Sequence, residues 1–360
     1  MAIKKKEKKE NLTIIFVLPI ILTIIGLYFI FEASSISAFR NFNDSFYYLK
    51  FQSLWFIIGV AVMVFFSLFD YRKLYYLSFP ALLVSIILLI IVLIPGIGHS
   101  VSGARRWIDL GIINFQPTEL AKFSVILYLC SWFLYKERKR FFSFVLLLSF
   151  LIFLIMLQPN MGTAIIVFAL FVIVYFMAGF ELHYLLFIIP TSLIAFFLLI
   201  KLSPYRMRRF LAFLSPQLDP LGITYHANQI LISLSSGGLF GRGFSESRQK
   251  YQFLPEAHTD SIFAIIGEEL GFLGGVILIG LLFFLIYKTF KVAQNAKDRF
   301  GQLLAGSIFS LIALHLIINL GGMVNLLPLT GIPLPFISYG GSSLLLFFAL
   351  MGILINIGKR

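Results

Sequence analysis

Charge is scarce in this chain of 360 residues. Asp, Glu, Lys and Arg together make up 12% of the sequence, whereas 59% of the residues are hydrophobic. A soluble domain carries about 25% charged residues, so this chain has too few to coat a surface that faces water. Apolar runs of about 20 residues recur instead, and each is long enough to cross a hydrocarbon core of about 30 Å. The composition therefore excludes an ordinary soluble protein and predicts an all-α polytopic membrane protein.

Several motifs of common enzyme classes are also missing. The sequence has no Gly-rich loop ending in Gly-Lys-Ser/Thr, no Gly-x-Gly-x-x-Gly after a strand and no Gly-x-Ser-x-Gly elbow. These absences argue against a site for ATP, for a dinucleotide or for a serine nucleophile of that type. The five histidines and the single cysteine, Cys130, have no metal-ligand spacing, so no metal site is predicted. One cysteine cannot form an internal disulfide, so it says nothing about the compartment.

Ten apolar segments predict about ten transmembrane helices. They lie near residues 12–31, 51–69, 75–94, 116–135, 141–157, 164–178, 184–200, 261–287, 303–321 and 344–358. More than half of the 29 Lys and Arg residues fall in cytoplasmic segments if the N-terminus is cytoplasmic. We therefore expect a basic cytoplasmic N-terminus at 1–11, a single transmembrane domain at 12–358 and a cytoplasmic C-terminus. A cleaved signal peptide is the alternative for the first run, but the run is long and lacks a small-residue cleavage site.

Two segments on the predicted outer side are not ordinary connections. The segment near 201–260, between the seventh and eighth helices, is long yet apolar in places, so we expect it to be ordered and packed on the bundle. The segment near 322–343 is too apolar for solvent and too rich in Pro and Gly for a helix. Such backbone lies at membrane depth only where protein or a wet cavity covers it, which predicts a re-entrant loop beside a cavity.

Asp260 stands where the long outer segment meets the eighth helix. Thr259 or Asp260 could simply cap that helix. The functional alternative is a general base that faces an outer cavity. A helix N-terminus lowers the pKa of a carboxyl and burial raises it, and the sequence leaves that balance open.

Other ionisable residues lie inside the apolar helices, where charge is costly. Glu268 and Glu269 are about two turns beyond Asp260, and either they serve a function or they pair with Lys122 or a backbone group. Glu119 and Lys122 share a helix face at a spacing of three residues. They either neutralise each other or hold an anion together.

Two arginine clusters lie on the predicted outer side. Arg105 and Arg106 precede the fourth helix, and Arg206, Arg208 and Arg209 begin the long segment. Arginine binds phosphate in a fork geometry, and contact with anionic headgroups is the alternative. Composition and spacing therefore predict a membrane protein with an outer cavity and an anionic lipid or sugar-phosphate ligand.

Seven segments, in order, resemble the SEDS family (shape, elongation, division and sporulation), which includes the FtsW, RodA and SpoVE types. The resemblance spans nearly the whole chain. The segments are Gly103–Ile108, Phe115–Lys122, Gln158–Thr163, Tyr205-Arg206 with Arg209, Ser236–Gly241, Leu254–Glu269 and Pro333–Ser343. The stretch 247–260 is similar to the FtsW branch, and Tyr225-His226 to the RodA branch. Asn160, Thr118 and Ser261 stand where the family usually has Asp, Ser and Phe, and Asn160 argues against a catalytic role for its turn.

The resemblance implies a peptidoglycan glycosyltransferase that polymerises lipid II on the outer face of the bacterial cytoplasmic membrane. It implies Asp260 as the general base and Glu268 and Glu269 as supporting acids. Substrate contacts are expected from Arg105, Arg206, Arg209, Lys122, Glu119, His258, Ser338 and Gly340. No cofactor is firmly implied, and a divalent cation, Mg²⁺ or Mn²⁺, is left open.

The resemblance also implies partners. These are lipid II, glycan linked to undecaprenyl pyrophosphate, a class B penicillin-binding protein, and other proteins of the divisome or the elongasome; no nucleic acid is expected. FtsW-like division is favoured, and RodA-like elongation is the alternative. A lipid II flippase that uses the buried Glu268, Glu269 and Lys122, and a scaffold without activity, are the remaining readings.

Overall fold

The structure is a computed structural model that describes residues 2–101, 104–109, 111, 114–134, 141–215, 219, 222–251 and 253–360. The predicted basic connection at 136–140 and Gly103 of the first matching segment lie outside these residues. The ten predicted helices are present. They are α1 (Ala2–Phe42), α2 (Tyr47–Leu68), α3 (Leu74–Ile91), α4 (Pro117–Trp132), α5 (Phe141–Leu157), α6 (Met161–Met177), α7 (His183–Lys201), α10 (Ile262–Asn295), α11 (Arg299–Met323) and α12 (Gly341–Lys359).

The helices have the lengths that a membrane requires. Within the described residues, seven of them are long and apolar enough to cross a bilayer, namely α1, α2, α3, α7, α10, α11 and α12. Helices α5 and α6 are apolar but shorter, and α4 carries Glu119 and Lys122 in its first two turns. The predicted all-α polytopic membrane fold is confirmed.

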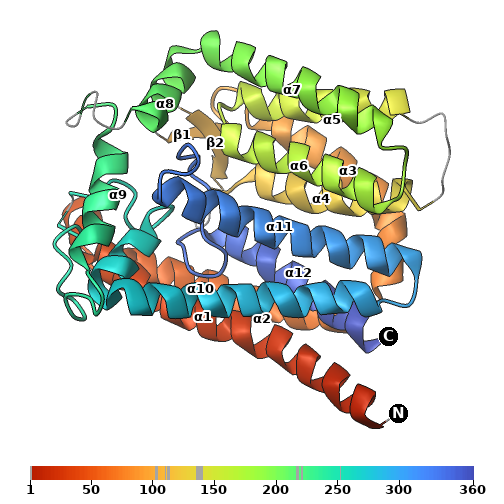
Figure 1. Ribbon diagram of the computed structural model, residues 1–360, viewed down its shortest axis with the longest axis horizontal. Helices are drawn as coiled ribbons and strands as arrows, with labels where there is room; N and C mark the ends of the chain where they lie inside the picture. The colour runs from red at the N-terminus through yellow and green to blue at the C-terminus, as the bar shows by residue number, and fades with distance from the viewer. Residues whose placement is uncertain are drawn as a thin grey trace.

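The helices run side by side along the long axis of the molecule (Figure 1). Helix α12 lies inside the bundle, since 89% of its most apolar 18-residue stretch is buried. Helix α7 lies at the edge, where only 17% of the corresponding stretch is buried. Helices α12 and α2 approach closely because Gly352 has no side chain; a Cβ there would lie 2.4 Å from the carbonyl oxygen of Met63. Both chain termini lie at one end of the bundle, and the long segment after α7 lies at the opposite end.

The long segment after α7 contains two helices that the hydropathy pattern does not predict. They are α8 (Pro204–Leu214) and α9 (Tyr225–Ser236). Helix α8 is strongly amphipathic with three arginines, so it is not apolar enough to be recognised as a span. A small antiparallel sheet also lies at this end and was not predicted, because its strands are short. The strands are β1 (Gly98–Val101), β2 (Ala104–Asp109) and β3 (Asn114–Phe115), in the order β1-β2-β3.

Helix α10 is broken at Gly271, whose φ of 69° is outside the helical range. The Gly-rich loop after α9 satisfies the backbone groups that the break leaves unpaired. Its N–H groups at Arg242 and Gly243 donate to the carbonyls of Glu268 and Glu269, at 3.0 and 3.1 Å. Its carbonyls at 238 and 239 accept from the N–H groups of residues 272 and 273, at 2.9 and 3.1 Å. The described parts of the long segment are therefore packed on the bundle, as predicted.

The segment between α11 and α12 covers the same end of the bundle. It is not helical, and Leu334, Phe336 and Ile337 are almost completely buried. Gln52 of α2 holds its end, because its side chain donates to the carbonyl of Ser338 at 3.3 Å and accepts from the N–H of Gly340 at 3.2 Å. The irregular backbone at 332–338 is therefore covered by protein, as expected for a loop at membrane depth.

Candidate active site

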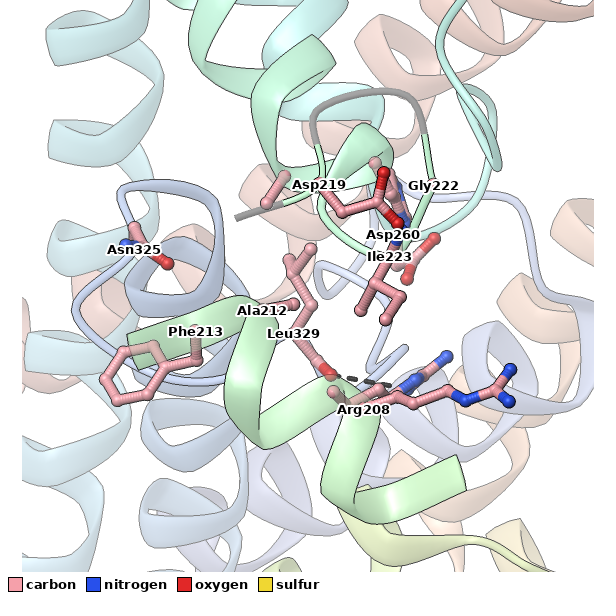
Figure 2. A pocket seen from close by; sticks show the side chains of 12 residues that line it. Arg208, Ala212, Phe213, Asp219, Gly222, Ile223, Asp260, Asn325 and Leu329 are labelled. Carbon is pink, nitrogen blue, oxygen red and sulfur yellow. Dashed lines mark hydrogen bonds between the residues drawn. The ribbon is translucent and has the colours of Figure 1, made fainter. Parts of the chain in front are cut away.

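A cavity of about 680 Å³ opens at the end of the bundle opposite the chain termini. Figure 2 shows its walls, which come from α8, the start of α9, the turn before α10 and the segment before α12. The volume lies within the range of about 300–1,000 Å³ that is usual for ligand pockets. Its lining residues are Arg208, Arg209, Ala212, Phe213, Asp219, Gly222, Ile223, His226, Ala227, Asp260, Asn325 and Leu329.

The half-buried carboxylate of Asp260 faces this cavity. Its Oδ1 accepts a hydrogen bond from the hydroxyl of Thr259 at 3.2 Å. Burial, and then the charge of Glu256, raise the pKa of Asp260 from 3.8 to about 6, although Arg209 acts in the opposite direction. At neutral pH the group is therefore largely ionised, yet it is a better base than an ordinary aspartate.

Gly331 lies beside this carboxylate. Its φ is +71°, in the left-handed region that favours glycine. A Cβ there would lie 3.6 Å from Oδ2 of Asp260, an ordinary contact, so the backbone conformation and not a lack of space favours glycine.

Neither Thr259 nor Asp260 caps α10, which was the structural alternative for this turn. The N-cap residue is Ser261, and no side chain provides a capping hydrogen bond there. The hydroxyl of Thr259 lies near the carbonyl and Oε2 of Glu256, at 3.1 and 2.9 Å, as well as near Asp260. The side chain of Asp260 is therefore directed to the cavity rather than to the helix end.

Arginines of α8 give the cavity its positive charge. Arg208 and Arg209 are both exposed and line it, and Nη1 of Arg209 donates to the carbonyl of Leu329 at 3.3 Å, the dashed line in Figure 2. Arg206, one turn earlier, points elsewhere and donates to the carbonyls of Leu199 and Met156, at 3.2 and 3.4 Å. Those carbonyls lie at the ends of α7 and α5, so Arg206 holds two helices together.

The other predicted arginine contacts lie in the small sheet. Arg105 of β2 is exposed and is not part of the cavity lining. Its neighbour Arg106 donates to the carbonyls of Gln158 and Pro159, in the turn before α6. That turn also contains Asn160, whose side chain caps α6 by accepting from the N–H of Thr163 at 3.2 Å. Asn160 therefore has a structural role.

Lys122 and Glu119 form a buried ion pair away from the cavity lining. Nζ of Lys122 lies 2.8 Å from Oε1 of Glu119 and 3.0 Å from Nε2 of His315 in α11. All three side chains are at most 4% exposed. Nδ1 of His315 lies 2.9 Å from the carbonyl of Leu311, so Nδ1 donates and Nε2 accepts from the lysine. His315 was not predicted, because nothing in the sequence places it beside Lys122.

Glu268 and Glu269 are both buried beneath the Gly-rich loop. Oε2 of Glu268 accepts from the hydroxyl of Ser247 at 2.6 Å, and its Oε1 accepts from the N–H of Arg248 at 3.2 Å. The guanidinium of Arg242 lies 3.7 Å from Oε1. Glu268 thus pairs with the loop and not with Lys122. The carboxylate of Glu269 faces the backbone of Ser245 and Ser247 in the same loop.

The remaining predicted contacts support the walls of the site. The ring of His258 packs against Tyr48 and Tyr339, with centroid distances of 4.3 and 5.5 Å. The hydroxyl of Ser338 accepts from the N–H of Leu334 at 2.9 Å, and the N–H of Gly340 donates to Gln52. None of these residues lines the cavity, so their role in binding stays a prediction.

In the described part of the chain, no three His, Cys, Asp or Glu side chains cluster as metal ligands would. A metal site built only from protein side chains is therefore not found there. The carboxylates at the cavity are those of Asp219 and Asp260, and Oδ2 of Asp219 already accepts from the N–H of Ile223 at 3.2 Å. Mg²⁺ often takes one or two carboxylates together with substrate phosphates. A divalent cation at this cavity remains a prediction.

The fold and the cavity define a class: a polytopic helical membrane protein with an activated carboxylate and two arginines in a cavity at one end of the bundle. The chain belongs to the cell cycle protein family FTSW_RODA_SPOVE, whose match covers residues 12–360. This confirms the family that the seven sequence segments indicate.

Relatives match the chain over nearly its full length. A protein of Trichlorobacter lovleyi, named "Probable peptidoglycan glycosyltransferase FtsW", is 39% identical over 96% of this chain and 92% of its own. Stage V sporulation protein E of Bacillus subtilis is 38% identical over 98% of both chains. The mixture of division and sporulation relatives leaves the branch of the family open.

Solved structures show the same fold. A chain from a structure titled "Structural coordination of polymerization and crosslinking by a peptidoglycan synthase complex" superposes with a TM-score of 0.77, with 28% identity and 96% of each chain covered. The rod shape determining protein RodA of Thermus thermophilus superposes with a TM-score of 0.70, with 26% identity over 96% of this chain and 95% of its own.

Proposed function

We propose that this protein is a peptidoglycan glycosyltransferase that polymerises lipid II, with Asp260 as its general base. The observation that carries the proposal is the cavity that a carboxylate of raised pKa lines together with two exposed arginines. Relatives named peptidoglycan glycosyltransferase FtsW match nearly the whole chain. The cavity therefore offers a negative group that can accept the acceptor proton and positive groups that can stabilise the leaving pyrophosphate.

The base step uses Asp260. The acceptor is the 4-hydroxyl of the N-acetylglucosamine of an incoming lipid II, and the donor is the growing strand on undecaprenyl pyrophosphate. The acceptor oxygen forms the new bond to the anomeric carbon of the donor while the bond from that carbon to pyrophosphate breaks, with inversion. The hydroxyl proton passes to the carboxylate of Asp260. A base with a pKa near 6 is ionised at neutral pH and accepts that proton more readily than an ordinary aspartate.

The leaving group is stabilised by arginine. Pyrophosphate gains negative charge as its bond to the sugar breaks, and guanidinium groups bind phosphate oxygens in pairs of hydrogen bonds. Arg208 and Arg209 of α8 line the same cavity as Asp260. Arg209 is already oriented by the carbonyl of Leu329. We assign leaving-group stabilisation to these two arginines, and we derive no step through a metal ion.

The proposed site lies on the outer face of the bacterial cytoplasmic membrane. The cavity is at the end of the bundle opposite both termini (Figure 1). The end that carries the termini also carries Arg72, Lys73, Lys297, Arg299 and Arg360, as expected of a cytoplasmic side. A class B penicillin-binding protein is the proposed partner, and the structural relative from a peptidoglycan synthase complex supports it.

The buried charges favour an enzyme over a lipid II flippase. A translocation path would need ionisable groups that are open to the substrate through the membrane. Lys122 is 1% exposed and paired with Glu119 and His315, and Glu268 is held by the Gly-rich loop. Each of these groups is paired with a neighbouring protein group and is closed to a substrate, so they do not line a path.

The test is polymerisation of purified lipid II in detergent with a cognate class B partner. Wild type, Asp260→Asn and Glu246→Gln are compared, the last as a control because Glu246 is an exposed acid of the same long segment outside the cavity lining. We expect glycan strands from wild type and Glu246→Gln and none from Asp260→Asn. Equal strands from all three would remove Asp260 as the base. No strands from wild type, with the partner bound, would favour a flippase or a scaffold.

A further inference from the structure

The turn at 255–261, which carries Asp260, is held from two sides. On one side, Nδ2 of Asn319 donates to the carbonyl of Asp260 at 2.9 Å. On the same side, the N–H of Tyr339 donates to the carbonyl of His258, also at 2.9 Å. The opposite side of the turn faces α9. The α9 residue that contacts it there is His226, which also lines the cavity.

His226 contacts both ends of this turn. Its Nε2 lies 2.7 Å from the hydroxyl of Ser261, a residue only 1% exposed, and the backbone of Pro255 also hydrogen-bonds the ring. Proline has no backbone N–H, so the carbonyl of Pro255 is the group that interacts with the ring.

The ring is uncharged at neutral pH. Burial, and then the charge of Arg209, lower the pKa of His226 to about 4. Nε2 of the neutral ring and the hydroxyl of Ser261, 2.7 Å apart, form one hydrogen bond in either tautomer, because a hydroxyl both donates and accepts. One side chain of α9 thus holds the last residue of the turn and lies against the first.

We propose that His226 and Ser261 form a positioning pair that fixes the turn at 255–261 from the α9 side and so places the carboxylate of Asp260 in the cavity. The pair acts through Asp260, so this inference rests on the proposed function. Ser261 stands where the family usually has Phe, so the hydroxyl that completes the pair is a feature of this chain. The ring also adds an uncharged polar wall next to Asp260.

The pair affects rate more than folding. Without it, the contacts of Asn319 and Tyr339 still hold the turn from the other side. A displacement of about 1 Å at a reacting group costs up to about 100-fold in rate. We therefore expect Ser261→Ala to lower kcat about 10- to 100-fold and to leave KM within about twofold. Ser261→Thr keeps the hydroxyl and should retain most of the activity.

The fall of the polymerisation rate at acidic pH provides a second readout of the position of Asp260. Asp260 is faced by Glu256 of its own turn, by Arg208 and Arg209 of α8, by Asp219 before α9 and by His226. The lining residues from the segment before α12, Asn325 and Leu329, are uncharged. A looser turn lets water reach the carboxylate, so the midpoint of the acidic limb should move in Ser261→Ala from about pH 6 toward the ordinary value of 3.8.

The experiment measures kcat, KM, the pH profile and the melting temperature of the complex with its class B partner. The variants are Ser261→Ala, Ser261→Thr, His226→Leu, His226→Gln and the double variant Ser261→Ala with His226→Leu. We expect similar losses in kcat from either single apolar variant, no further loss in the double variant, and recovery in Ser261→Thr and His226→Gln. His226→Gln also keeps the test available if His226→Leu does not fold, because glutamine retains a donor and an acceptor.

The outcomes separate this inference from the proposed function. Wild-type kcat and pH profile in Ser261→Ala and in His226→Leu, with only a lower melting temperature, would show that the pair merely packs α9 on the turn and would overturn the inference. Full additivity of the two losses would show that the residues do not act as a pair. Activity in Asp260→Asn would instead overturn the proposed base, whatever the pair does.

Discussion

Asn319 of α11 joins the turn at 255–261 to the segment before α12 through one amide group. Its Nδ2 donates to the carbonyl of Asp260 at 2.9 Å and to the carbonyl of Ile332 at 2.8 Å. Asn319 is 5% exposed, so water cannot replace either bond readily. The position of Asp260 therefore depends on a residue that is distant in sequence and does not line the cavity.

Replacing Asn319 by Asp should lower both stability and activity. The substitution keeps the shape of the side chain but removes the donor, so two buried carbonyls lose their partner at a cost of about 1–3 kcal/mol. We expect a lower melting temperature in detergent and slower polymerisation of lipid II. Asn295→Asp is the matched control, because Asn295 is an exposed asparagine near the end of α10 that contacts only the carbonyl of Lys291 among the described residues. An unchanged melting temperature in Asn319→Asp would contradict the assigned role.

Polymerisation should fall as the pH drops through about 6. Only the ionised carboxylate of Asp260 can accept a proton, and its pKa is raised to about 6 by burial and by Glu256. Activity is therefore complete above that pH and is lost below it, the reverse of what an acid catalyst would show. The check is kcat/KM from pH 5 to 8 at constant ionic strength. A rate that stays level down to pH 5 would mean that the group with this pKa does not act as the base.

Removing one member of the buried ion pair should destabilise the bundle. Lys122→Met leaves the carboxylate of Glu119 buried without its partner, at a cost of about 3–5 kcal/mol. Replacing Glu119 by Leu in the same chain removes the stranded charge, so the double variant should recover much of the lost melting temperature. Thermal unfolding of the two single variants and the double variant measures this coupling. Additive losses would show that Lys122 and Glu119 do not stabilise each other.

Arg209 and Arg206 are one turn apart on α8, and their substitution should have different effects. Arg209→Gln removes a guanidinium that stabilises the leaving pyrophosphate, so we expect kcat/KM for lipid II to fall at least about 10-fold, mainly through kcat, in line with a lost charged hydrogen bond of about 1.5–3 kcal/mol. Arg206→Gln breaks its contacts to α5 and α7, so the melting temperature should fall while KM changes little. A rise in KM from Arg206→Gln alone would place the substrate elsewhere.

The helical fold could be predicted because its cause is local. Each apolar run is long enough to span a bilayer, and the ten predicted segments all contain helices. Their ends were less accurate. Helix α1 extends from Ala2 to Phe42 rather than 12–31, since polar residues continue a helix once it leaves the apolar layer. The break at Gly271 was also missed, because it depends on pairing with a loop some 30 residues earlier.

The site could be predicted only in part. Asp260 was selected because it stands at the predicted start of a helix, and Arg209 because it belongs to an arginine cluster. The structure brings both to one cavity. Asn319, His315 and His226 were not selected, because each contacts its partner through tertiary packing that no sequence spacing reveals. The one available signal was the pair Tyr225-His226, which is similar to the RodA branch of the family and so set His226 apart from its neighbours.

The most direct test of Asp260 as the base is the release of undecaprenyl pyrophosphate from lipid II, measured at matched lipid II occupancy in the purified complex with the class B partner. If Asp260 removes the acceptor proton, wild type releases one pyrophosphate for each new glycosidic bond. Asp260→Asn should then bind lipid II equally well and release pyrophosphate at least about 100-fold more slowly, the usual scale of a lost general base. Equal release by the two proteins at equal occupancy would contradict that role and move the chemistry away from this cavity.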